Sequence, residues 1–218
     1  MGLYNGRIQL PSYFGIIKNK DGKLICEKNG RISDSYTGLA PFTDGKWYYV
    51  SKGIVDMSYT GLARSTNGSF YYVQEGMWDP GYTGFAMYTD GQWYFVKNGK
   101  MNSVYTGLAF NRSNGGWFFV RKGRHDPVYT GIGRSTNGML YFVRNGAWDT
   151  SYTGLAQYTD GKWYYVKDGR HDAEFTGVAK STNDKLYYVK NGMWDISFSG
   201  EATDAEGVSY KVSDGKVL

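Results

Sequence analysis

The two histidines are the side chains best suited to acid–base chemistry, and an aspartate follows each of them. His125 and His171 occupy the same place in the Arg-His-Asp segments 124–126 and 170–172. A histidine beside a carboxylate suggests a proton relay, but neighbouring residues of a strand point to opposite faces. No nucleophile recurs with either pair. We therefore interpret both histidines as space-filling residues.

Carboxylates also recur along the chain, one at a time. A short acceptor side chain stands three residues before eight of the nine Tyr-Thr-Gly-type segments, at Ser33, Asp56, Asp79, Asn102, Asp126, Asp149, Asp172 and Asp195. No second acidic residue accompanies them at a fixed spacing, which disfavours calcium binding or paired-carboxylate catalysis, and we expect each to fix an Asx-type bend. The sequence has no P-loop, zinc-ligand spacing, nucleophile elbow or EF-hand loop. We expect no enzyme activity, no metal site and no cofactor.

These residues lie in a segment that recurs nine times. Its anchor, Tyr-Thr-Gly or a close variant, starts at every 23rd residue with a single step of 24, at Tyr13, Tyr36, Tyr59, Tyr82, Tyr105, Tyr129, Tyr152, Phe175 and Phe198. Such a period is typical of one supersecondary unit that stacks on copies of itself. We predict an N-terminal cap over residues 1–12, eight tandem repeats over 13–197, and a ninth, degenerate capping repeat over 198–218.

Each repeat has two turn signals around a short aromatic strand. The first, exemplified by Asp44-Gly45, predicts a type I′ hairpin turn. The second is a glycine present in all nine repeats, such as Gly53, and it marks a backbone position that a Cβ would strain. With 18% aromatic residues and 31 glycines, no helix is expected. The predicted fold is all-β, a solenoid of stacked β-hairpins built from nine repeats of ~23 residues.

Seven repeats contain one tryptophan each, in one of two positions. In the strand 47–50, period-2 alternation puts Tyr48 and Val50 on one face, our candidate core, and Trp47 and Tyr49 on the other. The tryptophans occupy either the Trp47 position or the position eight residues later, as Trp47, Trp93, Trp117 and Trp163 or as Trp78, Trp148 and Trp194. We interpret this as volume compensation, with one indole filling a space that the two positions of one hairpin share. Alternatively, each repeat presents one indole to a ligand, and a ring that is buried at one edge could serve both purposes.

Composition excludes several partners. The 25 basic and 20 acidic residues give a net charge of +5, but they are scattered, which disfavours nucleic-acid binding. No apolar run approaches the ~20 residues that span a bilayer, so we expect no membrane insertion. The single cysteine, Cys26, allows no disulfide framework. The chain starts without the pattern of a signal peptide, and we expect it to be part of a longer secreted polypeptide.

The repeat resembles the choline-binding and glucan-binding repeats of bacterial cell-wall-attaching proteins. The resemblance rests on Thr-Gly, then Asp-Gly-Lys-Trp-Tyr-Tyr-Val, then a glycine turn, and it is most specific at residues 47–49, 93–95, 117–119 and 163–165. It implies hairpins that bind choline on teichoic acid, or glucan, between consecutive repeats. The tryptophan that follows Thr-Gly in the choline family is replaced here by Leu39, Leu62, Phe85, Leu108, Ile132, Leu155 and Val178. Because a quaternary ammonium needs several ring faces, stacking of a sugar on one exposed ring is the less demanding alternative.

We therefore predict a non-catalytic, extracellular module at the bacterial cell surface. It would bind a wall polysaccharide, teichoic acid or another surface glycan weakly at many sites. The predicted ligand-binding residues are Trp47, Trp78, Trp93, Trp117, Trp148, Trp163, Trp194, Tyr49 and Tyr72. The alternative is a structural spacer or adhesin stalk in which the aromatic residues serve only packing.

Overall fold

The computed structural model describes residues 3–4, 7–8 and 13–218, and these residues form strands and turns without any helix. The predicted all-β solenoid of stacked β-hairpins is confirmed. The chain forms two compact units, Met1–Ser103 and Val104–Leu218. In the first unit the two-residue strands β1 (Leu3–Tyr4) and β2 (Arg7–Ile8) also pair with each other. Most of the cap predicted over residues 1–12 lies outside the described residues.

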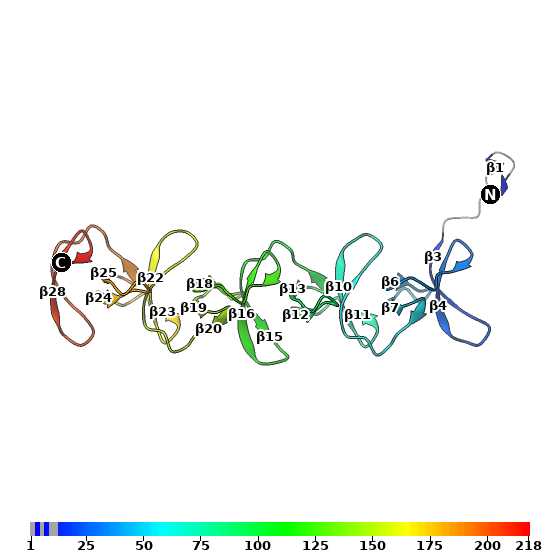
Figure 1. Cartoon of the computed structure of the whole chain (residues 1–218), viewed down its shortest axis with the longest axis horizontal. Coiled ribbons are helices and arrows are strands. Elements are labelled where there is room, and N and C mark those ends of the chain that lie inside the picture. The colour runs from blue at the N-terminus through cyan, green and yellow to red at the C-terminus, as the bar shows by residue number, and fades with distance from the viewer. Residues whose placement is uncertain (1–2, 5–6, 9–12) are drawn as a thin grey trace. The chain divides into compact units, whose positions relative to one another are not determined.

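Each repeat begins with an antiparallel hairpin, as β6 with β7 and β15 with β16 illustrate in Figure 1. The first strands start at or next to the Tyr-Thr-Gly glycine. They are β3 (Phe14–Lys18), β6 (Gly38–Pro41), β9 (Gly61–Arg64) and β12 (Gly84–Met87) in the first unit, and β15 (Gly107–Asn111), β18 (Gly131–Arg134), β21 (Gly154–Gln157), β24 (Gly177–Lys180) and β27 (Gly200–Thr203) in the second. The second strands are β4 (Leu24–Lys28), β7 (Trp47–Ser51), β10 (Phe70–Gln74) and β13 (Trp93–Lys97), then β16 (Gly116–Arg121), β19 (Leu140–Arg144), β22 (Trp163–Lys167), β25 (Leu186–Lys190) and β28 (Ser209–Ser213).

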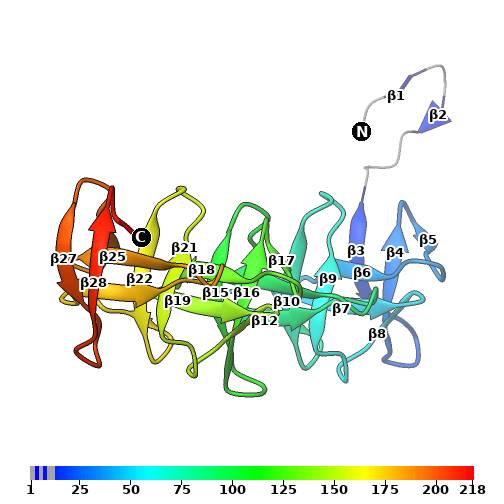
Figure 2. The same ribbon diagram turned by 60° about the vertical axis from the view of Figure 1, so that its left-hand side comes forward.

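A two-residue third strand ends each repeat, and within each unit such strands join a repeat to the one before it. These strands are β5 (Arg31–Ile32), β8 (Ile54–Val55), β11 (Met77–Trp78) and β14 (Lys100–Met101), then β17 (Arg124–His125), β20 (Ala147–Trp148), β23 (Arg170–His171), β26 (Met193–Trp194) and β29 (Lys216–Val217). Each pairs with the second strand of its own repeat, and β11 also pairs with β7 of the preceding repeat through Met77 and Tyr48. Figure 2 shows β7 and β8 of one repeat near β9 and β10 of the next. Hydrogen bonds therefore link consecutive hairpins.

The first turn differs from the prediction in type. At the first turn only Gly45 has a positive φ (83°), and its N–H donates to the Phe42 carbonyl at 3.1 Å, so this is a three-residue loop with an αL glycine. The type I′ turn is the second one, where both Lys52 (φ 47°) and Gly53 (φ 78°) are left-handed. A Cβ on Gly53 would lie 2.6 Å from the Ser33 carbonyl oxygen, which confirms that this position needs glycine.

The core is continuous through both faces of each hairpin. Leu39 and Tyr49 of the second repeat pack against Ala63 and Val73 of the third. The expected core face is buried, with Val50 and Tyr48 packed against the first repeat, but Tyr49 of the opposite face is buried as well, because the third repeat covers that side of the same hairpin. At the last repeat, Glu201 and Lys211 stand where Leu39 and Tyr49 stand in the second, and both are exposed. The domain boundaries, including the capping role of 198–218, stay a prediction.

Anchor aromatic residues stack on aromatic rings of the preceding repeat. The Tyr59 ring stacks on Tyr49 with centroids 3.8 Å apart, and its hydroxyl donates to the Leu62 carbonyl at 2.5 Å. The same stacking joins Phe142 to Tyr152 at 3.8 Å in the second unit. Tyr59 and Tyr152 are therefore each held by both a ring face and a hydrogen bond.

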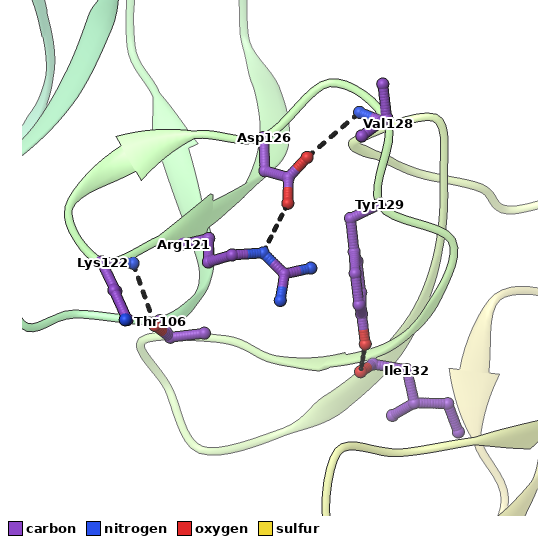
Figure 3. Close-up of polar contacts among 7 residues, drawn as sticks. All are labelled: Thr106, Arg121, Lys122, Asp126, Val128, Tyr129 and Ile132. Atoms are coloured by element: carbon purple, nitrogen blue, oxygen red, sulfur yellow. Dashed lines mark hydrogen bonds and ion pairs between the residues drawn. The ribbon is translucent and has the colours of Figure 1, made fainter.

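The Asx-type bends predicted before the anchors are confirmed. In Figure 3, one carboxylate oxygen of Asp126 accepts the Val128 N–H at 3.2 Å and the other accepts Arg121 Nε at 2.6 Å. Burial alone would raise the pKa of Asp126, but these hydrogen bonds outweigh it and hold the pKa below its usual value. The same panel shows the Tyr129 hydroxyl on the Ile132 carbonyl, 2.6 Å away. Bend, ion pair and anchor thus fix the start of the next repeat together.

Candidate functional site

The two tryptophan positions meet between consecutive repeats, not within one. Inside a hairpin, Val55 pairs with Val50, three residues along the strand from Trp47. Trp47 instead belongs to the same cluster as Trp78 of the following repeat. The interpretation as volume compensation within one hairpin was therefore wrong. The register brings the indoles of neighbouring repeats together in pairs.

In the first unit, Trp47 and Trp78 line an open cavity, which we call the Trp47 notch. Its volume is about 200 Å³, and its lining consists of Leu39, Trp47, Ser65, Asn67, Tyr71 and Trp78. The Tyr71 and Trp78 rings meet edge to face, with centroids 5.7 Å apart and planes at 76°. Two indoles and one phenol therefore surround a space whose lining carries no charged side chain.

The same three rings recur twice in the second unit. Trp117, Tyr141 and Trp148 form one set, in which Tyr141 lies 6.4 Å from Trp117 and 5.2 Å from Trp148 between ring centroids. Trp163, Tyr187 and Trp194 form the other, with corresponding distances of 6.3 and 5.1 Å. In each set the tyrosine lies roughly parallel to the first indole, at 19° and 26°, and across the second. Because their rings match those of the Trp47 notch, we call these two ring sets the Trp117 and Trp163 notches.

The two indoles of a notch are held differently. The third-strand indoles donate to a glycine carbonyl of the next repeat, Trp148 to Gly169 at 3.0 Å and Trp194 to Gly215 at 3.0 Å. Within the described part of the chain, no acceptor pairs with the indole N–H of Trp117 or Trp163. The third-strand ring is therefore fixed in place, while the strand ring is held by packing alone.

A buried serine accompanies each set of three rings. Ser65, Ser135 and Ser181 stand six residues after the anchors of the third, sixth and eighth repeats, and they are buried. In the fourth and seventh repeats the same position holds Tyr88 and Tyr158. A hydroxymethyl group at this position leaves room beside the indoles that a phenol ring would fill.

A basic residue accompanies the tyrosine of each notch. The cross-strand partners of the notch tyrosines are Lys100 for Tyr71, Arg170 for Tyr141 and Lys216 for Tyr187. Lys100 Nζ lies 5.8 Å from the Tyr71 ring centroid, and Arg170 Cζ lies 5.9 Å from that of Tyr141. Three other pairs of this register have an apolar partner, Met77 opposite Tyr48, Met193 opposite Tyr164 and Ala147 opposite Phe118. A basic side chain therefore lies opposite the tyrosine of each tryptophan-lined notch.

The histidines stand at the third-strand position of the indoles, as expected for space-filling residues. His171 meets the Tyr164 ring edge to face, with centroids 5.2 Å apart. Burial lowers its pKa below the ordinary value, although the Gly192 backbone and the charge of Asp172 act in the opposite direction. Its Nε2 is buried without a hydrogen-bond partner among the described residues, so the ring fills the indole position without making the bond to a glycine carbonyl that Trp148 and Trp194 make.

The remaining predicted site residues lie outside the notches. Tyr49 is 6% exposed and Tyr72 is 9% exposed, and both rings are stacked inside the core. Trp93 is half-buried at the start of β13, opposite Met87. We therefore leave Tyr49 and Tyr72 out of the proposed site.

Sequence reasoning missed the notch tyrosines and the serine beside each set of rings. The serine could have been found, because it lies in a sequence pattern that recurs before the third-strand tryptophans. Basic-Ser-Thr-Asn precedes every third-strand tryptophan, at residues 64–67, 134–137 and 180–183. That segment places the small residue in the repeat that supplies the second indole.

The residues that the structure describes contain no group of three or more His, Cys, Asp and Glu side chains that could hold a metal ion. None of their elements is a helix long and apolar enough to cross a membrane.

Comparison with solved structures returns only distant likenesses. One is a catalytically inactive virginiamycin B lyase from Staphylococcus aureus with quinupristin, at 13% identity over 98% of this chain and 87% of that chain, with a TM-score of 0.16. Another is a streptogramin B lyase, at 13% identity over 94% of this chain and 70% of that chain, with a TM-score of 0.13. These TM-scores are too low to support any inference about activity. No curated protein matches the sequence significantly.

A family model, in contrast, matches the repeats directly. The choline-binding repeat model matches residues 35–56, 81–102, 104–126, 151–172 and 174–195. These segments make up just over half of the chain, and each contains the hairpin and third strand described above. The chain belongs to the choline-binding repeat family.

Proposed function

We propose that this chain is a non-catalytic cell-wall-binding module that holds choline groups of a wall teichoic acid in its tryptophan-lined notches. Choline-binding repeats are found in cell-surface proteins, and the family is typically a binding module. The observation that carries the proposal is the convergence of Trp47, Tyr71 and Trp78 on one cavity of about 200 Å³. The module would act outside the cell, at the bacterial surface.

The notch suits a quaternary ammonium better than a sugar. A trimethylammonium group cannot donate hydrogen bonds, so it is best held by several aromatic faces, and three are present here. The sequence alone suggested a missing ring, since Leu39 follows Thr-Gly. Trp78 of the next repeat supplies a ring face to the same cavity. The leucine that replaces the tryptophan after Thr-Gly is therefore no argument against choline binding.

The charges around the notches favour an anionic polymer as the carrier of the choline. Lys100 and Arg170 lie against the notch tyrosines, where a bare cation would be repelled. A teichoic acid carries a phosphate close to each choline, and that phosphate would face these side chains. Three notches on one chain would bind a repetitive polymer more tightly than any single notch does.

Titration with choline, followed by tryptophan fluorescence and calorimetry, tests the proposal. We expect saturable binding with a stoichiometry of three. Trp47→Ala, Trp117→Ala and Trp163→Ala should each remove one site, and the triple variant should no longer be retained on choline-containing walls.

Leu140→Ala is the matched control, because Leu140 occupies the same strand position at an interface without a tryptophan pair. It should lower stability and keep three sites. A chain that binds neither choline nor walls while remaining folded would refute the proposal and favour the spacer or stalk.

A further inference from the structure

The tyrosine of the Trp47 notch accepts a hydrogen bond from the protein and keeps its own hydroxyl proton. Asn67 Nδ2 donates to the Tyr71 hydroxyl oxygen at 3.2 Å. The backbone sets the direction of this bond, because Asn67 Oδ1 accepts the Ser69 N–H at 2.9 Å and the amide nitrogen must then face Tyr71. Among the described residues, no acceptor takes the Tyr71 proton. The hydroxyl is therefore able to donate to a ligand.

The Trp163 notch has the same arrangement. Asn183 Nδ2 donates to the Tyr187 hydroxyl oxygen at 3.2 Å, while Asn183 Oδ1 accepts the Lys185 N–H at 3.2 Å. The Ser181 hydroxyl donates to the same Oδ1, so two donors hold the amide in this direction. Tyr187 thus also keeps a proton that the protein does not use.

The hydrogen bond runs the other way at interfaces without a tryptophan pair. There an aspartate stands in place of the asparagine, and an ionised carboxylate can only accept. Tyr48 donates to Asp44 at 2.6 Å, and Tyr164 donates to Asp160 at 2.9 Å. The strand tyrosine therefore spends its proton on the protein at these interfaces, whereas the asparagine leaves it available in the notches.

Positive charge accompanies the available hydroxyl of Tyr187. This ring belongs to the Trp163 notch and also borders an open cavity of about 480 Å³. The lining of that cavity consists of Asp184, Lys185, Leu186, Tyr187, Lys216 and Val217. The Asp184 carboxylate pairs with Lys180 Nζ at 2.8 Å, whereas Lys185 and Lys216 have no ion-pair partner in the described part of the chain. Two uncompensated ammonium groups therefore share the cavity with the hydroxyl.

The Trp47 notch has a lysine in the corresponding place. Lys100 pairs across the strands with Tyr71, and its Nζ lies 5.8 Å from the centroid of that ring. An O–H donor and an ammonium group both form their strongest hydrogen bonds with an anionic oxygen. The two notches therefore offer the same pair of donors to the same kind of ligand atom.

We propose that these two notches contain a phosphate subsite and select phosphocholine over free choline. The phosphate would accept from the tyrosine hydroxyl and the lysine, while the quaternary ammonium, a two-carbon chain away, lies against the rings. Asn67 and Asn183 are then specificity-determining residues, since they keep the hydroxyl proton available. This inference rests on the proposed function, because the phosphate is reached from a choline held in the notch.

Calorimetric titration with choline and with phosphocholine tests the subsite. We expect phosphocholine to bind about fivefold more tightly, the size expected for partly exposed charge-assisted contacts. Phosphatidylcholine vesicles present the same group on a lipid. We expect the chain to be retained on choline-containing walls and not to sediment with these vesicles, and the opposite result would overturn a wall polymer as the source of the group.

Substitutions separate the hydroxyl from the general positive charge of the chain. The double variant Tyr71→Phe with Tyr187→Phe keeps both rings, and its ratio of phosphocholine to choline affinity should fall by about twofold or more. Asn67→Asp should lower the ratio as well, because an aspartate takes the tyrosine proton, as Asp160 does. Tyr164→Phe is the matched control, since it removes a hydroxyl at an interface without a tryptophan pair, and it should keep the ratio of the unmodified chain.

The results distinguish this inference from choline binding itself. Equal affinities for choline and phosphocholine, or a preference that the double tyrosine variant retains in full, would overturn the phosphate subsite and leave choline binding intact. A folded chain that binds neither compound would overturn both proposals.

Discussion

Substituting one turn glycine should be far more damaging than substituting another with nearly the same backbone conformation. Gly99 (φ +69°) and Gly91 (φ +76°) both lie in the left-handed region, in the second and first turns of the fourth repeat. A Cβ on Gly91 would meet nothing within 4 Å. A Cβ on Gly99 would lie 2.4 Å from the Asp79 carbonyl oxygen and 2.6 Å from Pro80 Cα.

These distances set the expected difference in stability. Alanine in the left-handed region costs about 1 kcal/mol at either site, partly offset by the loss of freedom in the unfolded chain. At Gly99 the Cβ meets backbone atoms, which cannot rotate away, and overpacking adds roughly 1–3 kcal/mol. We therefore expect Gly99→Ala to be about 2 kcal/mol less stable than Gly91→Ala. For a chain of this size that corresponds to a melting temperature roughly 4–8 °C lower.

Gly99→Ala should also disturb the Trp47 notch. The added Cβ would lie 2.9 Å from Trp78 Nε1, which donates to the Gly99 carbonyl at 3.3 Å. Displacing that indole should weaken choline binding at this notch and leave the Trp117 and Trp163 notches unchanged. Thermal unfolding by circular dichroism and choline titration provide the two measurements. Equal melting temperatures for Gly99→Ala and Gly91→Ala would show that the second turn is not sterically constrained.

Three further predictions follow from the notches and the anchors. Trp148→Phe should cost about 1 kcal/mol more than Trp163→Phe in urea unfolding, because only Trp148 donates to a protein carbonyl; equal losses would contradict this difference. Ser65→Tyr should fill the Trp47 notch and reduce the choline stoichiometry by one at unchanged fluorescence-detected folding, and a full set of sites would show that the serine does not open it. Burial raises the pKa of the anchor Tyr152 to about 12, and that of Tyr59 likewise to about 12. Because the pKa of tyrosine in the unfolded chain is about 10, the free energy of unfolding should be constant below pH 10 and fall as the pH rises towards 12. Urea midpoints and phenolate absorbance would show this. A free energy of unfolding that does not change over that range would contradict the burial of these hydroxyls.

Local sequence determined the repeat, the strands and the fold class. The 23-residue period is visible along the chain, the glycine at Gly53 and the aromatic strand 47–50 are visible within one repeat, and all three agree with one another. The bend at Asp126 could also be predicted, because its carboxylate bonds to a backbone N–H only two residues away. Interactions of this kind depend on few dihedral angles and little else.

The contents of the site were decided only by the tertiary structure. Whether Trp47 meets Val55 of its own hairpin or Trp78 of the next depends on the offset at which one repeat stacks on another. That offset is set by the pairing of Met77 with Tyr48, across 29 residues of sequence. A single repeat carries one indole and contains no trace of the partner ring. The notch forms only when two consecutive hairpins pack in this register, so it depends on contacts between repeats and not on the sequence of one repeat.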